Sequence, residues 1–130
     1  MALSRGPALT VSEQSVSLSS QQREAQFALG TSVYTVRLES RAPDLCDAAV
    51  TLARDRRTQR LYGPDQHRFA CDEPHFEISW AGDLDRDGRL DLLTTFSSKY
   101  SYYPRQLWLS SAASPGELIS EVGRYDRFAQ

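Results

Sequence analysis

The chain has 130 residues, of which 40% are hydrophobic, and a formal net charge of −2. This length is typical of one domain that buries a core, so we expect a single domain over residues 1–130. An acidic chain with a pI near 5.6 has no overall positive field for a phosphate backbone, which argues against nucleic acid as a partner.

The N-terminal segment, residues 1–22, is rich in serine and glutamine, and we expect it to be partly frayed. Its few apolar residues alternate well enough to form short strands: Leu9, Val11, Val16 and Leu18. No run of the chain approaches the roughly 18 apolar residues that a membrane helix needs, so we expect no transmembrane segment. The first residues also lack the apolar core of a signal peptide, so an exported protein would already have lost its signal.

Alternation of apolar and polar residues predicts strands in the next part of the chain. Segments 25–29 and 32–39 flank Gly30 and Thr31, and together they predict a β-hairpin. Segment 47–53 mixes residues that favour helix with residues that favour strand, so both structures stay open there. The basic run 54–60 is predicted to be a charged connection rather than a phosphate site.

The second half of the chain repeats this strand signal. Four further segments alternate or are rich in β-branched and apolar residues: 75–80, 90–96, 106–110 and 117–125. Short strands separated by glycine and proline turns predict an all-β fold, either an antiparallel sandwich or a partly open barrel.

The chain has 2 cysteines, Cys46 and Cys71, and we predict that they form a disulfide. The alternative is two buried thiols that pack as small apolar groups. A disulfide would be typical of an oxidising compartment, here the periplasm or the outside of the cell. All but one of the 15 basic residues are arginine, which favours a bacterial source.

The most informative stretch gathers carboxylates around Gly88. Hard cations such as calcium take six to eight oxygen ligands, and carboxylates at alternate positions of a tightly wound loop can converge on one ion. A glycine at the sixth place lets the backbone turn sharply, because it has no Cβ. The predicted calcium ligands are the side chains at places one, three, five and nine and the carbonyl at place seven: Asp83, Asp85, Asp87, Asp91 and Arg89.

This Asp-x-Asp-x-Asp-Gly-x-x-Asp sequence, followed by an apolar strand, resembles the calcium loops of extracellular integrin-type (FG-GAP-like) repeats and, more loosely, those of dockerin modules. The resemblance implies a calcium ion bound between two strands by the matching residues named above. The run from Trp80 to Ser110 also looks like loop-plus-hairpin segments of small exported bacterial proteins of unassigned role.

The alternative to a calcium loop is a solvated acidic turn, since aspartate and glycine are common in turns. Mutual repulsion of the carboxylates argues against it, at about 4 kcal/mol for a pair about 4 Å apart at an effective dielectric near 20. Thr94 occupies place twelve, where helix-loop-helix calcium sites have a bidentate glutamate. The expected dissociation constant is therefore in the extracellular range, on the order of 10⁻⁴ to 10⁻³ M.

A second informative stretch follows the loop. Three tyrosines and an arginine form a predicted partner-binding patch for a protein or a carbohydrate: Tyr100, Tyr102, Tyr103 and Arg105. Aromatic side chains with polar groups are enriched at recognition surfaces, although they are also ordinary components of a β-rich fold.

Catalysis has little support in the sequence. The only imidazoles are His67 and His75, and no serine lies in a Gly-x-Ser-x-Gly elbow. We therefore expect a calcium-binding, non-catalytic exported domain that acts as an interaction module. A periplasmic inhibitor or immunity-type protein of a secreted enzyme is the first alternative, and a hydrolase is the second.

Overall fold

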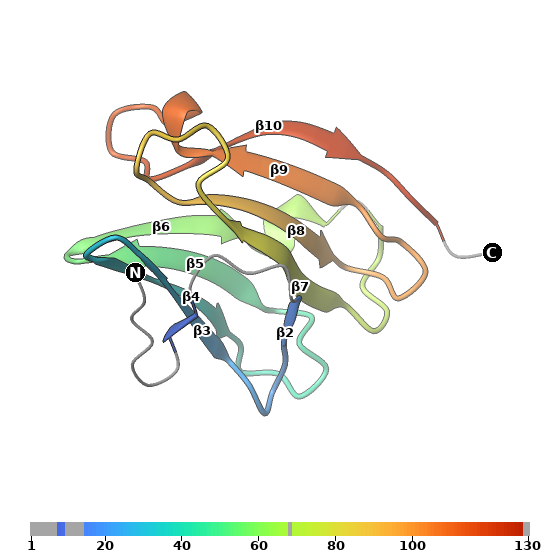
Figure 1. Ribbon diagram of the computed structural model, residues 1–130. Coiled ribbons are helices and arrows are strands. Elements are labelled where there is room, and N and C mark those ends of the chain that lie inside the picture. The colour runs from blue at the N-terminus through green and yellow to red at the C-terminus, as the bar shows by residue number, and fades with distance from the viewer. Residues whose placement is uncertain (1–7, 10–14, 68, 129–130) are drawn as a thin grey trace.

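The computed structural model describes residues 8–9, 15–67 and 69–128, and it is an all-β sandwich of two sheets (Figure 1). Sheet A has five strands, in the spatial order β1 (Ala8–Leu9), β3 (Glu24–Leu29), β4 (Ser32–Glu39), β5 (Ala49–Arg54) and β6 (Arg57–Tyr62). Sheet B also has five, in the order β10 (Ser120–Tyr125), β9 (Arg105–Leu109), β8 (Asp91–Ser97), β7 (His75–Gly82) and β2 (Val16–Leu18). Two short 3₁₀ helices, η1 (Pro64–Gln66) and η2 (Ser110–Ala112), complete the described elements.

Neighbouring strands are antiparallel except for β1 and β3, which pair in parallel. The predicted hairpin is confirmed as β3 and β4, and the predicted all-β sandwich is confirmed as well. Segment 47–53, left open between helix and strand, contributes to β5. The expected short strands near the N-terminus include β1 and β2, while residues 1–7 and 10–14 of that prediction lie outside the described residues.

The prediction of a charged connection over 54–60 is wrong, because most of this run belongs to β6. The strand begins at Arg57, after a turn in which Asp55 has a positive φ of 56°. β6 is the edge strand of sheet A, where charged side chains remain in water while Leu61 and Tyr62 reach the interior. The charged residues of this run therefore indicate an edge strand rather than a loop.

The core lies between the sheets, and each sheet supplies the alternate residues that face inward. Sheet A contributes Val36 and Leu52, and sheet B contributes Phe76 and Phe96, all at most 2% exposed. A buried polar side chain, Gln106, also belongs to this inner surface. Its amide accepts hydrogen bonds from the Thr94 hydroxyl and the Phe96 N–H and donates one to the Phe96 carbonyl, so its polar atoms are paired.

The predicted disulfide is confirmed between Cys46 and Cys71, whose Cα atoms are 5.8 Å apart. Cys46 precedes β5 of sheet A and Cys71 precedes β7 of sheet B, so the bond joins the connections that lead into the two sheets. The adjacent Asp47 organises the first of these connections. Its carboxylate accepts hydrogen bonds from the Ser40 hydroxyl and the Arg41 N–H, which hold its pKa below the usual value.

His67, directly after η1, gives the fold a predicted acid sensitivity. Its ring lies 5.8 Å from the ring of Tyr62, and its Nε2 atom is buried without a hydrogen-bond partner among the described residues. Burial lowers the pKa of His67 from 6.5, while the nearby charge of Asp65 opposes the shift. Because the neutral ring is favoured in the native state, the contribution of His67 to stability should be present above pH 6.5 and should be lost as the pH falls below it.

Urea unfolding at about pH 7.5 and about pH 5 measures this effect, in wild type and in His67→Gln. We expect the urea midpoint of the wild type to fall more than that of the variant. An equal loss in both proteins would show that other groups cause the acid sensitivity.

Candidate metal centre

The candidate site is the loop that joins β7 to β8, drawn in gold in Figure 1. Gly82 and Asp91 form the last described pair of the β7–β8 ladder, so residues 83–90 connect the two strands. The backbone takes a positive φ twice within the loop, 63° at Arg86 and 80° at Gly88. Gly88 adopts this conformation without the steric penalty that a Cβ would bring. The sequence prediction of a loop between two strands is therefore confirmed.

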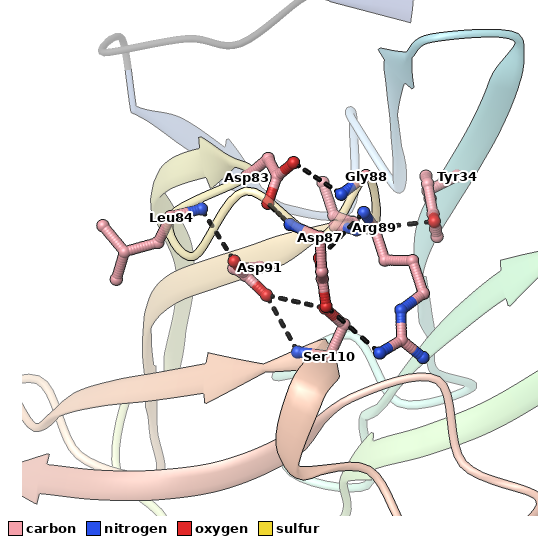
Figure 2. A network of polar contacts seen from close by, with 9 residues as sticks. Tyr34, Asp83, Leu84, Asp87, Gly88, Arg89, Asp91 and Ser110 are labelled. Atoms are coloured by element: carbon pink, nitrogen blue, oxygen red, sulfur yellow. Dashed lines mark hydrogen bonds and ion pairs between the residues drawn. The ribbon is translucent and has the colours of Figure 1, made fainter.

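The loop folds around the carboxylate of Asp83, which accepts hydrogen bonds from later residues (Figure 2). Its Oδ1 atom accepts a hydrogen bond of 3.0 Å from the Asp87 N–H, and its Oδ2 atom accepts one of 2.7 Å from the Gly88 N–H. Short aspartate side chains commonly bond local backbone groups in turns. The result is a compact loop in which the first carboxylate faces the later residues.

Asp91, at the other end of the loop, is fully buried although it is a carboxylate. Its Oδ2 atom accepts a hydrogen bond of 2.7 Å from the Leu84 N–H. Its Oδ1 atom accepts bonds from the Ser110 N–H at 2.8 Å and from the Ser110 hydroxyl at 3.0 Å. Asp91 thereby connects the start of the loop to η2, as Figure 2 shows. These donors compensate the loss of water around its oxygens.

The loop brings Asp83, Asp85 and Asp91 together, with one carboxylate oxygen of each within 4.8 Å of the others. Asp83 is half-buried, Asp91 is buried and Asp85 is exposed. Within the described part of the chain, the Asp85 carboxylate has no hydrogen bond that fixes it. A carboxylate oxygen that accepts one hydrogen bond retains a further lone pair, so Asp83 and Asp91 still have acceptor capacity for an ion.

Asp87 does not join this cluster. Its carboxylate accepts a hydrogen bond of 3.0 Å from the Arg89 N–H and pairs with the Arg89 guanidinium at 3.1 Å. It also lies 2.8 Å from the Ser110 hydroxyl, whose single hydrogen is shared between Asp87 and Asp91. Burial alone would raise the pKa of Asp87, but these hydrogen bonds and the Arg89 charge outweigh it and lower the pKa. Three of the four predicted carboxylates therefore converge, while the fourth connects Arg89 to η2.

The donor set determines which ions fit this loop. All the gathered side chains are carboxylates, which suit calcium or magnesium, whereas copper and zinc sites are usually built with imidazole or thiolate ligands. Calcium tolerates irregular, flexible shells of six to eight oxygens, which carbonyls and water can complete. Magnesium requires a nearly ideal octahedron and keeps several of its waters. An exposed Asp85 carboxylate that no hydrogen bond to a described residue fixes, beside two fixed carboxylates, is better matched to calcium.

The structure separates the four residues of the predicted tyrosine patch. Tyr102 is 2% exposed, and its hydroxyl donates a hydrogen bond of 2.7 Å to Asp126, so its ring is not available to a partner. Tyr100 and Tyr103 are 52% and 40% exposed, and Arg105 is exposed as well. The sequence argument treated the tyrosines as one patch, whereas burial alternates from Tyr102 to Gln106 in step with β9.

Two residues missed by the sequence argument lie opposite this patch. Tyr125 is the partner of Arg105 in the β9–β10 ladder, and Arg127 follows two residues later. The Tyr103 N–H donates a hydrogen bond of 2.7 Å to the Arg127 carbonyl. The sequence signal that could have identified them is the spacing of Tyr125 and Arg127, because Tyr103 and Arg105 on the facing segment have the same tyrosine-x-arginine spacing.

Comparisons of the chain with protein-family models, with curated proteins and with solved structures find no match. Among the described residues, none of the helices has the length and apolar character needed to span a membrane.

Proposed function

We propose that this protein is a calcium-binding, non-catalytic β domain that acts as an interaction module in the periplasm or outside the cell. The observation that supports this most directly is the convergence of Asp83, Asp85 and Asp91 to within 4.8 Å in the loop between β7 and β8. The ion would fix the β7–β8 hairpin in one conformation. The mechanism is preorganisation, in which binding to a partner no longer has to order the loop.

Electrostatics gives the reason for a cation at this place. Two carboxylates about 4 Å apart repel each other by about 4 kcal/mol at an effective dielectric near 20. Asp83 and Asp91 are held in position by backbone N–H groups, so they cannot separate without breaking those bonds. Asp85 is held by no such bond to a described residue and would move toward a bound ion. Calcium would thus turn a repulsive cluster into an attractive one.

The disulfide supports the proposed compartment, because such bonds persist where thiols are not kept reduced. Extracellular modules often bind calcium with dissociation constants on the order of 10⁻⁴ to 10⁻³ M. A loop without a bidentate glutamate at place twelve suits this range, since Thr94 stands there in β8. Calcium in the surroundings of an exported protein would then keep the site largely occupied.

The test is thermal unfolding of wild type and Asp85→Asn in EDTA, in calcium and in magnesium. At calcium concentrations about ten times the dissociation constant, binding should stabilise the wild type by about 1.4 kcal/mol, or a rise in Tm of about 4 to 6 °C. Asp85→Asn should lose this rise, because one charged ligand is removed. Its Tm in EDTA should not fall below that of the wild type, since no hydrogen bond to a described residue is broken and one charge of a repulsive cluster is removed.

Asp72→Asn is the matched control, because Asp72 is an exposed aspartate outside the loop. It carries the same change in charge and should retain the full calcium response. A wild-type calcium response in Asp85→Asn, or an equal response to magnesium, would contradict the proposed site.

A further inference from the structure

The chain segments that lead into β9 and out of β10 face each other in one continuous register. Arg105 lies opposite Tyr125 in the β9–β10 ladder. Three residues further along, Tyr102 pairs with Phe128 in an isolated antiparallel bridge. Tyr103 therefore lies opposite Arg127, as its N–H bond of 2.7 Å to the Arg127 carbonyl also indicates. The result is two adjacent tyrosine–arginine pairs in which the residue types alternate between the segments.

Both pairs lie on the outer face of sheet B. Residues directly opposite each other in an antiparallel ladder point to the same face, and successive residues point to opposite faces. Gln106 points into the core and is 2% exposed, so its neighbour Arg105 points outward. Tyr103 packs on His75, whose neighbour Phe76 is a core residue, with ring centres 4.9 Å apart. We call the set Tyr103, Arg105, Tyr125 and Arg127 the Tyr–Arg face.

The Tyr–Arg face is well exposed and continues into an apolar row. Tyr103 is 40% exposed and Tyr125 is 67% exposed. Trp80, Leu93 and Leu107 are paired in one row across β7, β8 and β9, and each is only half-buried. This row ends at Gly123, where a Cβ atom would meet nothing within 4 Å. The outer face thus combines an accessible apolar strip with aromatic and cationic groups beside it.

The charges on the Tyr–Arg face are not neutralised by nearby acids. Arg105 and Arg127 form no ion pair with any described residue, whereas Arg124, on the opposite side of β10, pairs with Glu121 at 2.9 Å. Glu77 is on the same outer face, but the strand β8 separates it from β9. The chain as a whole is acidic, with a formal charge of −2. A local excess of guanidinium groups on an acidic protein favours an acidic partner.

We propose that the Tyr–Arg face, with the adjacent apolar row, is a docking surface for an acidic segment of another protein. Tyrosine and arginine are enriched at the energetic centres of protein interfaces, and arginine binds carboxylates through two parallel hydrogen bonds. Side chains two residues apart on facing strands lie about 7 to 8 Å apart, a spacing that acidic side chains of one peptide can match. The inference rests on the proposed function as an interaction module, and it specifies the class of partner, an acidic protein segment.

The apolar row is the reason to choose a protein over an acidic polysaccharide. Protein interfaces have an apolar centre and a polar rim, and they bury about 800 Å² on each partner. Trp80, Leu93 and Leu107 would form the apolar part of the desolvated centre, and the adjacent Tyr–Arg face would supply its tyrosine and arginine side chains. A polyuronate carries carboxylates but no large apolar side chains to cover this row.

The probe is a fluorescent deca-glutamate peptide, titrated by fluorescence anisotropy in EDTA at about 50 mM salt, where surface charges are only partly screened. EDTA prevents calcium from bridging the peptide and the acidic loop. We expect the double variant Arg105→Gln/Arg127→Gln to weaken binding at least tenfold. The control Arg41→Gln/Arg56→Gln removes the same charge from exposed arginines elsewhere and should leave binding within about twofold of the wild type.

Three results would overturn the proposal. They are an equal loss of binding in both double variants, no measurable binding to the wild type, or tighter and Arg105-dependent binding of an oligogalacturonate probe of equal charge. Asp85→Asn should bind deca-glutamate like the wild type. The acidic loop precedes β8 at Asp91, whereas Tyr103 follows the other end of β8, at Ser97. A failed calcium site and a failed docking surface therefore give different results.

Discussion

Removal of the Cys46–Cys71 disulfide is expected to lower the free energy of unfolding by about 3.5 kcal/mol. The two cysteines are 25 residues apart in sequence, and the bond restricts the unfolded chain over that length. It also joins the connections that precede β5 and β7, which belong to different sheets. In the double variant Cys46→Ala/Cys71→Ala, both sheets should therefore unfold together in one transition, with a Tm lower by about 10 °C or more.

Chemical denaturation of the double variant and of wild type, with and without a reducing agent, measures this loss. Reduction should move the wild type to the urea midpoint of the variant and should leave the variant unchanged. Calcium should still raise the Tm of both proteins, because no cysteine lies near the loop residues 83–91 in sequence. Equal midpoints for oxidised and reduced wild type would contradict the expected contribution of the bond.

Local sequence patterns were sufficient to predict the fold class. Period-two alternation in segment 32–39 alone separates inward Val36 from outward Arg37, and the structure shows this arrangement in β4. Composition was insufficient to predict the strand β6, because its position in the sheet depends on tertiary contacts. The strand β6 carries two arginines because one side of an edge strand borders water, a fact that depends on which strand ends the sheet.

The candidate metal site was predicted only in part, because sequence shows local properties but not tertiary contacts. Spacing identified the loop and the glycine that turns it, since both are local properties. It could not identify Ser110, which lies 19 residues beyond Asp91 in sequence and whose N–H and hydroxyl both lie within hydrogen-bond distance of its carboxylate. Nor could it show that Asp87 turns toward Ser110 and Arg89. Only the packing of η2 against the loop brings these groups together.

The Tyr–Arg face illustrates a further limit. A stretch of sequence shows which residue types occur together, but not which of them a neighbouring strand brings alongside. The facing pairs Arg105 with Tyr125 and Tyr103 with Arg127 require the register of β9 and β10. This register also places Tyr102 on the inner side, so the tyrosines of one run divide between core and surface.

Asp91→Ala is expected to destabilise the protein by about 3 to 5 kcal/mol even in EDTA. The substitution would leave the N–H group of Ser110 buried without an acceptor and would remove the partner of the part-buried Leu84 N–H, and the loss of such a bond costs about 1 to 3 kcal/mol. It would also leave a small cavity beside the Ser110 hydroxyl. Urea unfolding in EDTA measures this loss, and Asp85→Asn serves as the comparison that should show almost none.

Asp91→Asn separates the two roles of this carboxylate. The amide oxygen still accepts a hydrogen bond from Ser110, but its NH₂ group cannot accept the Leu84 N–H, so the loss in EDTA should be smaller, about 1 to 3 kcal/mol. The calcium response should disappear in both Asp91 variants, because the charged ligand is gone. A calcium-dependent rise in Tm that survives in Asp91→Asn would mean that Asp91 only fixes the loop and does not bind the ion. A loss below about 1 kcal/mol in Asp91→Ala would contradict the structural role instead.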